Sequence, residues 1–315
     1  MLRNLLVCGL LAGVCGGLLA TGFARVVGEG PVDQAIAFEQ RQATTGHAHD
    51  EAPVVSRAVQ KSLGLVTAAV VYGLSLGGLF ALAFAAVYGR VGRASPARTS
   101  IWLAAAAFVV VFLVPFVKYP ANPPSIGHPF TIHTRGQLYV VMVVGSLVLL
   151  GLAVFLGRRL RPRFGAVGAT VLAGVAFLVA YSILIGVLPS LGDLNANLAQ
   201  VHQFGYARAA TETPQPIVNI LSRPLTFGGK TYAPGQVVYP GFDADVLWKF
   251  RWYSVINQVL VWTVLALGFG ALLDRLDRPR RARPAGSSAS AADAADAAGA
   301  AGQDSQPAKP VEAAS

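Results

Sequence analysis

Six stretches of almost uninterrupted apolar residues constrain the fold of this chain more than any other feature. They run over residues 5–27, 64–88, 101–117, 137–157, 166–188 and 254–273. Each is long enough to cross a hydrocarbon core as a helix of about 20 residues. With 54% hydrophobic and only 13% charged residues, the chain also carries more apolar surface than one water-facing core takes up. We therefore predict an all-α fold, a polytopic membrane bundle of about six transmembrane helices.

The basic residues give this bundle an orientation. Arginines cluster after the second, fourth and sixth apolar stretches, at Arg90, Arg93, Arg98, Arg158, Arg159, Arg161, Arg163, Arg275, Arg278, Arg280, Arg281 and Arg283. Short arginine-rich connections stay in the cytoplasm, so both termini are expected there, in a multi-pass protein of the cell (inner) membrane. The net charge of +10 is then mainly a topology signal. Nucleic acid is not an expected partner, because these runs lie beside membrane spans and lack interleaved aromatic residues.

Composition divides the chain into a membrane domain, residues 1–283, and a tail, residues 284–315. The tail consists mostly of Ala, Gly, Ser, Asp and Pro, too few large apolar residues to offset the entropy of folding. We expect it to be disordered in the cytoplasm. The predicted topology leaves three outer connections, residues 28–63, 118–136 and 189–253.

The third outer connection is too long for a plain linker and predicts a small outer lobe. Within it, residues 225–232 have the pattern of a β-hairpin that turns on Gly228 and Gly229. Residues 242–251 then have the pattern of an amphipathic helix at the membrane interface, ahead of the sixth span. Asp243 or Asp245 is expected to cap that helix.

Four potential metal ligands, His47, His49, Asp50 and Glu51, stand within five positions of the first outer connection. Two imidazoles and two carboxylates form a nitrogen and oxygen set that suits divalent Co, Ni or Zn. The spacing is not that of ligands held on a rigid helix, so it is typical of a loop that captures a metal rather than of a preformed catalytic centre. A solvated polar loop is the alternative interpretation.

The remaining histidines also fall in outer connections, His128 and His133 in the second and His202 in the third. Imidazoles on one side of the bundle could converge on one metal site. Taken singly, each of these histidines is more often a surface or hydrogen-bonding residue. The proline-rich segment 118–124 precedes His128 and should form a stiff, extended cap at the outer interface. It serves either as an anchor, with Lys118 and Tyr119 at the headgroups, or as a gate.

The spans themselves offer packing devices and few polar groups. Gly9, Gly13 and Gly17 lie one turn apart on one helix face, which lets another helix approach closely, within the chain or in an oligomer. A clear Asp, Glu or His in the middle of a span is missing, and ion-coupled carriers usually have one on the transport path. The chain also lacks a phosphate-binding glycine loop, paired carboxylates and a nucleophile motif. We therefore do not expect an enzyme.

Several segments together resemble the CbtA family of cobalt transporter subunits. They are the basic start at residues 1–3, the glycine-rich first span, the histidine-bearing loop, the segment 118–124 and residues 247–251. The resemblance covers most of residues 1–275 and departs from the family in a long outer insertion at about 195–240. It implies a membrane component of cobalt uptake, linked to cobalamin synthesis and paired with a small one-span, histidine-bearing subunit of the CbtB type.

Our hypothesis is a membrane subunit that takes up Co(II) or a similar divalent ion as cargo, without a tightly bound cofactor. His47, His49, Asp50 and Glu51 would capture the ion, and His128 and His133 would pass it into the bundle. The alternative is a membrane scaffold or assembly protein that transports nothing and whose histidines are incidental.

Overall fold

A computed structural model describes residues 2–42, 56, 59–90, 94–204, 208–219, 224–227 and 229–281. Within these ranges, five helices are long and apolar enough to cross a membrane: Leu2–Arg41, Ser62–Val87, Pro96–Lys118, Pro129–Ala199 and Ala244–Leu276. The predicted membrane helical bundle is thus confirmed in its class. The four histidine-loop residues lie outside the described residues.

The first half of the bundle consists of three helical rods that include π-helical segments. The first rod is α1 (Leu2–Phe23), the π-helical η1 (Ala24–Gly28) and α2 (Glu29–Gln42), which follow one another without a break. The second is the π-helical η3 (Gln60–Gly64) and α4 (Leu65–Val87). The third is α5 (Pro96–Ala107), the π-helical η4 (Phe108–Leu113) and α6 (Val114–Lys118). The segment predicted as the first outer connection therefore begins as a helix.

The second half contains α7 (Ile132–Val187), preceded by the short 3-10 helix η5 (Pro129–Thr131). It continues with η6 (Leu191–Asp193), α8 (Asn195–Phe204) and the long α9 (Ala244–Arg281). Four short strands lie between α8 and α9: β1 (Ile217–Val218), β2 (Leu225–Phe227), β3 (Lys230–Tyr232) and β4 (Val237–Tyr239).

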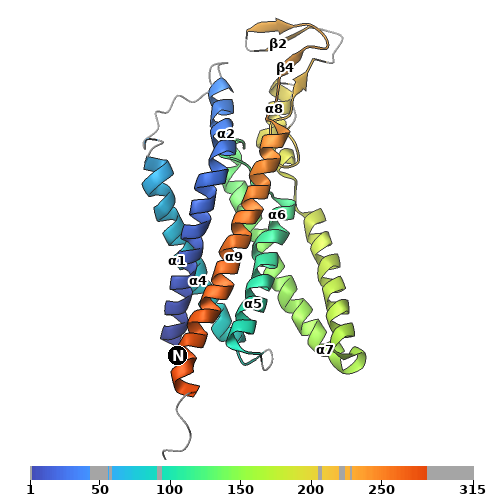
Figure 1. Cartoon of the computed structure of the whole chain (residues 1–315). Coiled ribbons are helices and arrows are strands. Elements are labelled where there is room, and N and C mark those ends of the chain that lie inside the picture. Colours follow the sequence, from blue (N-terminus) through green and yellow to red (C-terminus); the bar gives the residue numbers. More distant parts are fainter. Residues whose placement is uncertain are drawn as a thin grey trace, which may run out of the picture.

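Helix α7 is a hairpin of two arms rather than one straight rod. Gly165 has φ +70° and ψ −179°, a conformation outside the helical region, and Pro162 just before it lacks the amide hydrogen that a helix needs. The chain reverses there, so the two arms run side by side (Figure 1). A Cβ built at Gly157 would lie 3.4 Å from the Ala173 Cβ, which is ordinary contact between the arms. Each arm overlaps one of the apolar stretches 137–157 and 166–188.

The glycine face of α1 packs against α4 of the same chain. A Cβ added to Gly9 would overlap the Gly77 carbonyl, and one added to Gly13 would overlap the Gly73 carbonyl. The two backbones approach so closely because neither side has a side chain at the contact. Of the two uses expected for this motif, packing within the chain is the one that the structure shows, since Gly9, Gly13 and Gly17 are all buried in the monomer.

Helix α9 completes the core. It lies against α1 and α5, and its buried aromatic and aliphatic side chains pack with those of α1 and α4 in one cluster (Figure 1). The rings of Phe80 and Phe84 both meet the Phe269 ring edge-on, with centroids 5.2 and 4.9 Å apart. The Ser100 hydroxyl donates a hydrogen bond of 2.8 Å to the Ala266 carbonyl, which joins α5 to α9.

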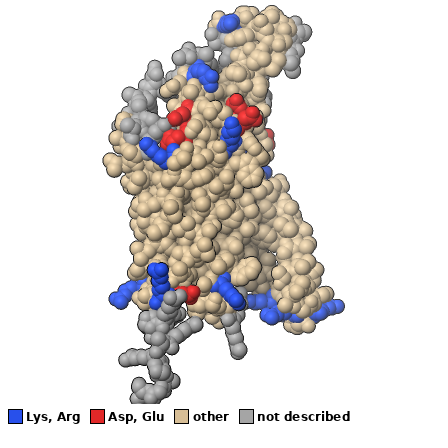
Figure 2. All heavy atoms as spheres, in the orientation of Figure 1, with Lys and Arg blue, Asp and Glu red and all other residues tan. Residues whose placement is uncertain are grey.

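The two ends of the bundle differ in character. We call the end that carries the strands the lobe end, and the opposite end, where α1 begins and α9 finishes, the terminal end (Figure 1). The bend of α7 and the α4–α5 connection also lie at the terminal end. Figure 2 shows Lys and Arg gathered there, acidic and basic residues together nearer the lobe end, and a broad band without visible charges between them.

The lobe contains two small antiparallel strand pairs, β1 with β4 and β2 with β3. In the second pair Phe227 is opposite Lys230, so the predicted hairpin at 225–232 is confirmed; Gly229 has φ +75°, as a tight turn requires. The predicted cap is also confirmed. The Asp243 carboxylate accepts hydrogen bonds from the backbone amides of Asp245 and Val246, at 2.8 and 3.3 Å.

Candidate functional site

A buried ionic cluster centred on Glu212 holds the lobe end together. The Glu212 side chain is fully buried, in a residue with φ +66°. Its carboxylate lies 3.2 Å from Nε of Arg135, in the first turns of α7. It also accepts hydrogen bonds from Thr131 at 2.5 Å and from Asn197 of α8 at 2.8 Å. Because a buried carboxylate without partners is very unfavourable, these groups fix three segments of the lobe end relative to one another.

This cluster is better suited to stabilise the fold than to bind a metal ion. One carboxylate oxygen faces the Arg135 guanidinium, and the other already accepts two hydrogen bonds. A cation placed beside Arg135 would meet a like charge. This cluster could not be predicted from the sequence, because its members are far apart along the chain and no local motif marks them.

His128, one of the predicted ligands, lies beside this cluster and caps η5. It is 5% exposed, and its Nδ1 accepts a hydrogen bond of 3.2 Å from the Phe130 amide. Burial lowers the pKa of His128, the positive charges of Arg208 and Arg135 lower it further, and Glu212 acts in the opposite direction. The imidazole is therefore neutral, with its proton on Nε2 because Nδ1 is an acceptor. Binding a metal through either nitrogen would cost the cap, because Nδ1 would then either hold the metal or carry the proton moved from Nε2.

Only part of the predicted ligand set lies among the described residues. His133 lies in the first turn of α7 with an exposed side chain, and His202 is in α8. His47, His49, Asp50 and Glu51 lie outside the described residues. Among the residues that the structure describes, there is no group of three or more His, Cys, Asp or Glu side chains that could hold a metal. Capture by these residues stays a prediction.

The proline-rich segment 118–124 is tied down on several sides. The Tyr119 hydroxyl donates to the Pro189 carbonyl at 2.8 Å, and the Asn122 amide donates to the Thr211 carbonyl at 2.7 Å. Arg251 of α9 donates to the Asn122 side-chain oxygen at 3.0 Å. Tyr119 is 6% exposed, so the expectation that it anchors the chain at lipid headgroups is wrong. Its ring packs in a cluster with α7 instead.

A cavity of about 340 Å³ opens near the lobe end of the bundle. Its wall comes from the α1–η1–α2 rod, from η3 and α4, from Pro124 and from α9. Five side chains of that wall carry polar atoms: Glu29, Gln60, Tyr253, Ser254 and Asn257. The Asn257 Oδ1 atom is buried and has no hydrogen-bond partner among the described residues.

Glu29 is the acidic residue of this cavity, and sequence reasoning placed it in a loop. The apolar stretch 5–27 ends just before it, but the helix continues through η1 into α2. Its carboxylate lies 3.9 Å from Arg25 one turn earlier, and the two side chains are 24% and 51% exposed. If the helix had been extended by one turn beyond the apolar stretch, its periodicity would have placed the Glu29 carboxylate on the helix face that meets the bundle.

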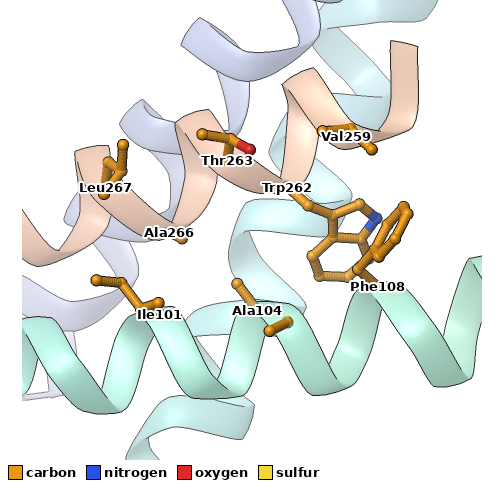
Figure 3. A pocket seen from close by; sticks show the side chains of 9 residues that line it. Ile101, Ala104, Phe108, Val259, Trp262, Thr263, Ala266 and Leu267 are labelled. Carbon is orange, nitrogen blue, oxygen red and sulfur yellow. The ribbon is translucent and has the colours of Figure 1, made fainter. Parts of the chain in front are cut away.

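A second space, of about 280 Å³, lies between α5 and α9 inside the apolar band. Figure 3 shows Phe108 and Trp262 at one end of it, with Ile101 and Leu267 at the other. Thr263 supplies the one hydroxyl of this lining. This groove has too few oxygen or nitrogen ligands for a metal ion. Of the two spaces, only the cavity at Glu29 combines volume with ligand atoms.

The chain matches the model of a protein family. The family model described as "Probable cobalt transporter subunit (CbtA)" matches residues 2–274, nearly the whole chain. No curated protein and no solved structure matches.

Proposed function

The chain belongs to the CbtA family, and on that premise we propose that it is the membrane subunit of an uptake system for Co(II) or a similar divalent cation. The observation that carries the proposal is the family match over residues 2–274, in a chain whose described residues form a membrane helical bundle. A divalent ion cannot cross hydrocarbon unaided, so a bundle with polar groups at one end suits this task.

We place the bundle in the cell (inner) membrane with six crossings, counting the two arms of α7 separately. The gathering of Lys and Arg at the terminal end supports a cytoplasmic position for that end and for both termini (Figure 2). The lobe end then faces outward. The Glu212 cluster and the capped start of α9 give the outward face a fixed shape.

In this orientation, His47, His49, Asp50 and Glu51 belong to an outward-facing connection and capture the ion. Support comes from where that connection is attached. It leaves from α2 and returns at η3, and both Glu29 of α2 and Gln60 of η3 line the same cavity. Glu51 is nine residues from Gln60, a distance of at most about 32 Å in extended chain. A captured ion is therefore within reach of the cavity. His133, exposed on α7, and His128, after loss of its cap, would assist transfer.

The family description names a subunit, which implies a partner. We propose a small one-span, histidine-bearing membrane protein for this role. Its histidines would add nitrogen ligands to a chain whose own cavity offers only oxygen.

Uptake of labelled cobalt into cells at limiting metal tests the capture loop. The double variant His47→Ala, His49→Ala should lower uptake severalfold, because two of four ligands are lost. Thr44→Ala, Thr45→Ala alters the same connection without touching a ligand and should leave uptake unchanged. Uptake equal to wild type in the histidine variant would refute the capture role.

A further inference from the structure

We infer that the cavity between α2, η3 and α9 is a binding site for a hydrated divalent cation, with the Glu29 carboxylate and the Asn257 side-chain oxygen as its protein ligands. The inference deepens the proposed function, on which it rests for the identity of the cargo. It assigns a position inside the bundle where the ion stops after capture.

The side chains of the cavity wall have the chemistry of cation ligands. Glu29 supplies a carboxylate, Asn257 an amide oxygen, and Ser254 a hydroxyl whose proton is used, because it donates to the Phe250 carbonyl at 2.8 Å. The Ser254 oxygen therefore presents lone pairs. Carboxylate, amide and hydroxyl oxygens together form a ligand set for a hard or borderline divalent cation.

The Asn257 side-chain oxygen is positioned to accept an interaction from a bound ion. It is a buried acceptor that no donor among the described residues satisfies. Buried acceptors almost always have a partner, so something in the cavity should occupy this position. A metal ion or one of its waters satisfies the acceptor. The amide of Gln258, next along α9, accepts from the Tyr72 hydroxyl at 3.3 Å, which joins α9 to α4 beside the cavity.

The Glu29 carboxylate gives the cavity a negative charge. Glu29 already attracts one cation, since Arg25 lies 3.9 Å from its carboxylate. Arg25 is 51% exposed, so this pair is only partly shielded from water.

The cavity is large enough for a hydrated divalent ion. The cavity volume is about 340 Å³. Six first-shell waters occupy on the order of 180 Å³, at about 30 Å³ each. The cavity thus holds a divalent ion that keeps most of its water. Such a site binds weakly and releases readily, as a transport path requires.

Local backbone structure explains why a cavity forms at this position. Both η1 and η3 are π-helical where they border it, and Ala24, Gly28 and Gln60 of these segments line it. A π-helical turn is wider than an α-helical one and is often found at functional sites. Gly28 adds no side chain to fill the space.

Equilibrium binding of radioactive Co(II) to the purified full chain tests the inference. The protein carries His47→Ala, His49→Ala, Asp50→Asn and Glu51→Gln, so that the loop does not contribute, and has no histidine tag. One weak site is expected. Glu29→Gln and Asn257→Leu, on two different helices, should each weaken it by at least about tenfold. Glu39→Gln, at an exposed position of the same α2 helix, should leave it unchanged.

The melting temperature of each variant in detergent shows whether it is folded. The variant Glu29→Asp, which keeps the charge, should retain part of the affinity for Co(II). Unchanged Co(II) affinity in Glu29→Gln, or no Co(II) bound by the parent protein at millimolar metal, overturns the inference. These outcomes are independent of the proposed function. Loss of cellular uptake in the loop variant, with Co(II) binding to the cavity intact, would separate capture from this second site.

Discussion

Replacement of Glu212 by alanine should loosen the whole lobe end. The substitution removes the partner of Arg135 and leaves the donors of Thr131 and Asn197 in a buried space without an acceptor. Removing one partner from a buried ion pair costs about 3 to 5 kcal/mol. Arg135 is 28% exposed and recovers some hydration, so we expect the lower limit, about 3 kcal/mol.

Hydrogen exchange measures this effect locally. A loss of about 3 kcal/mol raises the exchange of protected amides by roughly 100-fold, since 1.4 kcal/mol is a factor of ten. The amides of residues 208–219 and of α8 should respond, whereas those of α1 and α4 should not. Glu212→Gln keeps an acceptor for Thr131 and Asn197 and should change exchange by much less. Asp193→Asn, at an exposed position, is the matched control. Exchange in Glu212→Ala within about threefold of wild type would refute the reasoning, since that is under 1 kcal/mol.

Three further substitutions test other parts of the fold. Gly13→Leu drives a side chain into the Gly73 carbonyl and should destabilise the detergent-solubilised protein by at least about 1 to 3 kcal/mol, whereas Gly22→Leu, with nothing within 4 Å, should be neutral in the same melting assay. Folding lowers the pKa of His128, so its contribution to the free energy of unfolding should be intact above the unfolded pKa of about 6.5 and should fall as the pH drops toward the folded pKa. The variant His128→Asn should therefore lose less melting temperature than wild type between pH 7.5 and 5.5. Asp243→Ala removes the cap of α9 and should cost about 1 kcal/mol, seen as faster exchange in its first turn, and unchanged exchange there would contradict the capping role.

Features with a local physical cause were predictable from the sequence. Apolar length alone indicates the membrane helices, and two adjacent glycines between β-forming residues indicate the hairpin at 225–232. The Asp243 cap follows from the position of one acidic residue ahead of a helix. In each case the residues that decide the structure are neighbours along the chain.

Features that depend on distant residues were not predictable. Glu212 and Arg135 are 77 positions apart, and neither stands in a recognisable motif. The sequence shows Gly73 and Gly77 one turn apart in the second apolar stretch, but it does not show that they lie opposite the glycines of α1. Glu29 was assigned to a loop because the apolar pattern stops before it, although the helix does not. His128 was predicted as a ligand because the sequence does not reveal its role as a cap. That role depends on the backbone conformation of the following turn.

The claim that this chain moves a divalent metal is tested most directly by reconstitution. The chain is placed in proteoliposomes together with the small one-span protein that we propose as its partner, and influx of Co(II) is followed with a metal-sensitive dye inside the vesicles. We predict influx well above that of protein-free vesicles, reduced by Glu29→Gln and unaffected by Glu39→Gln. Influx no greater than in protein-free vesicles would contradict the account and favour a membrane scaffold that transports nothing.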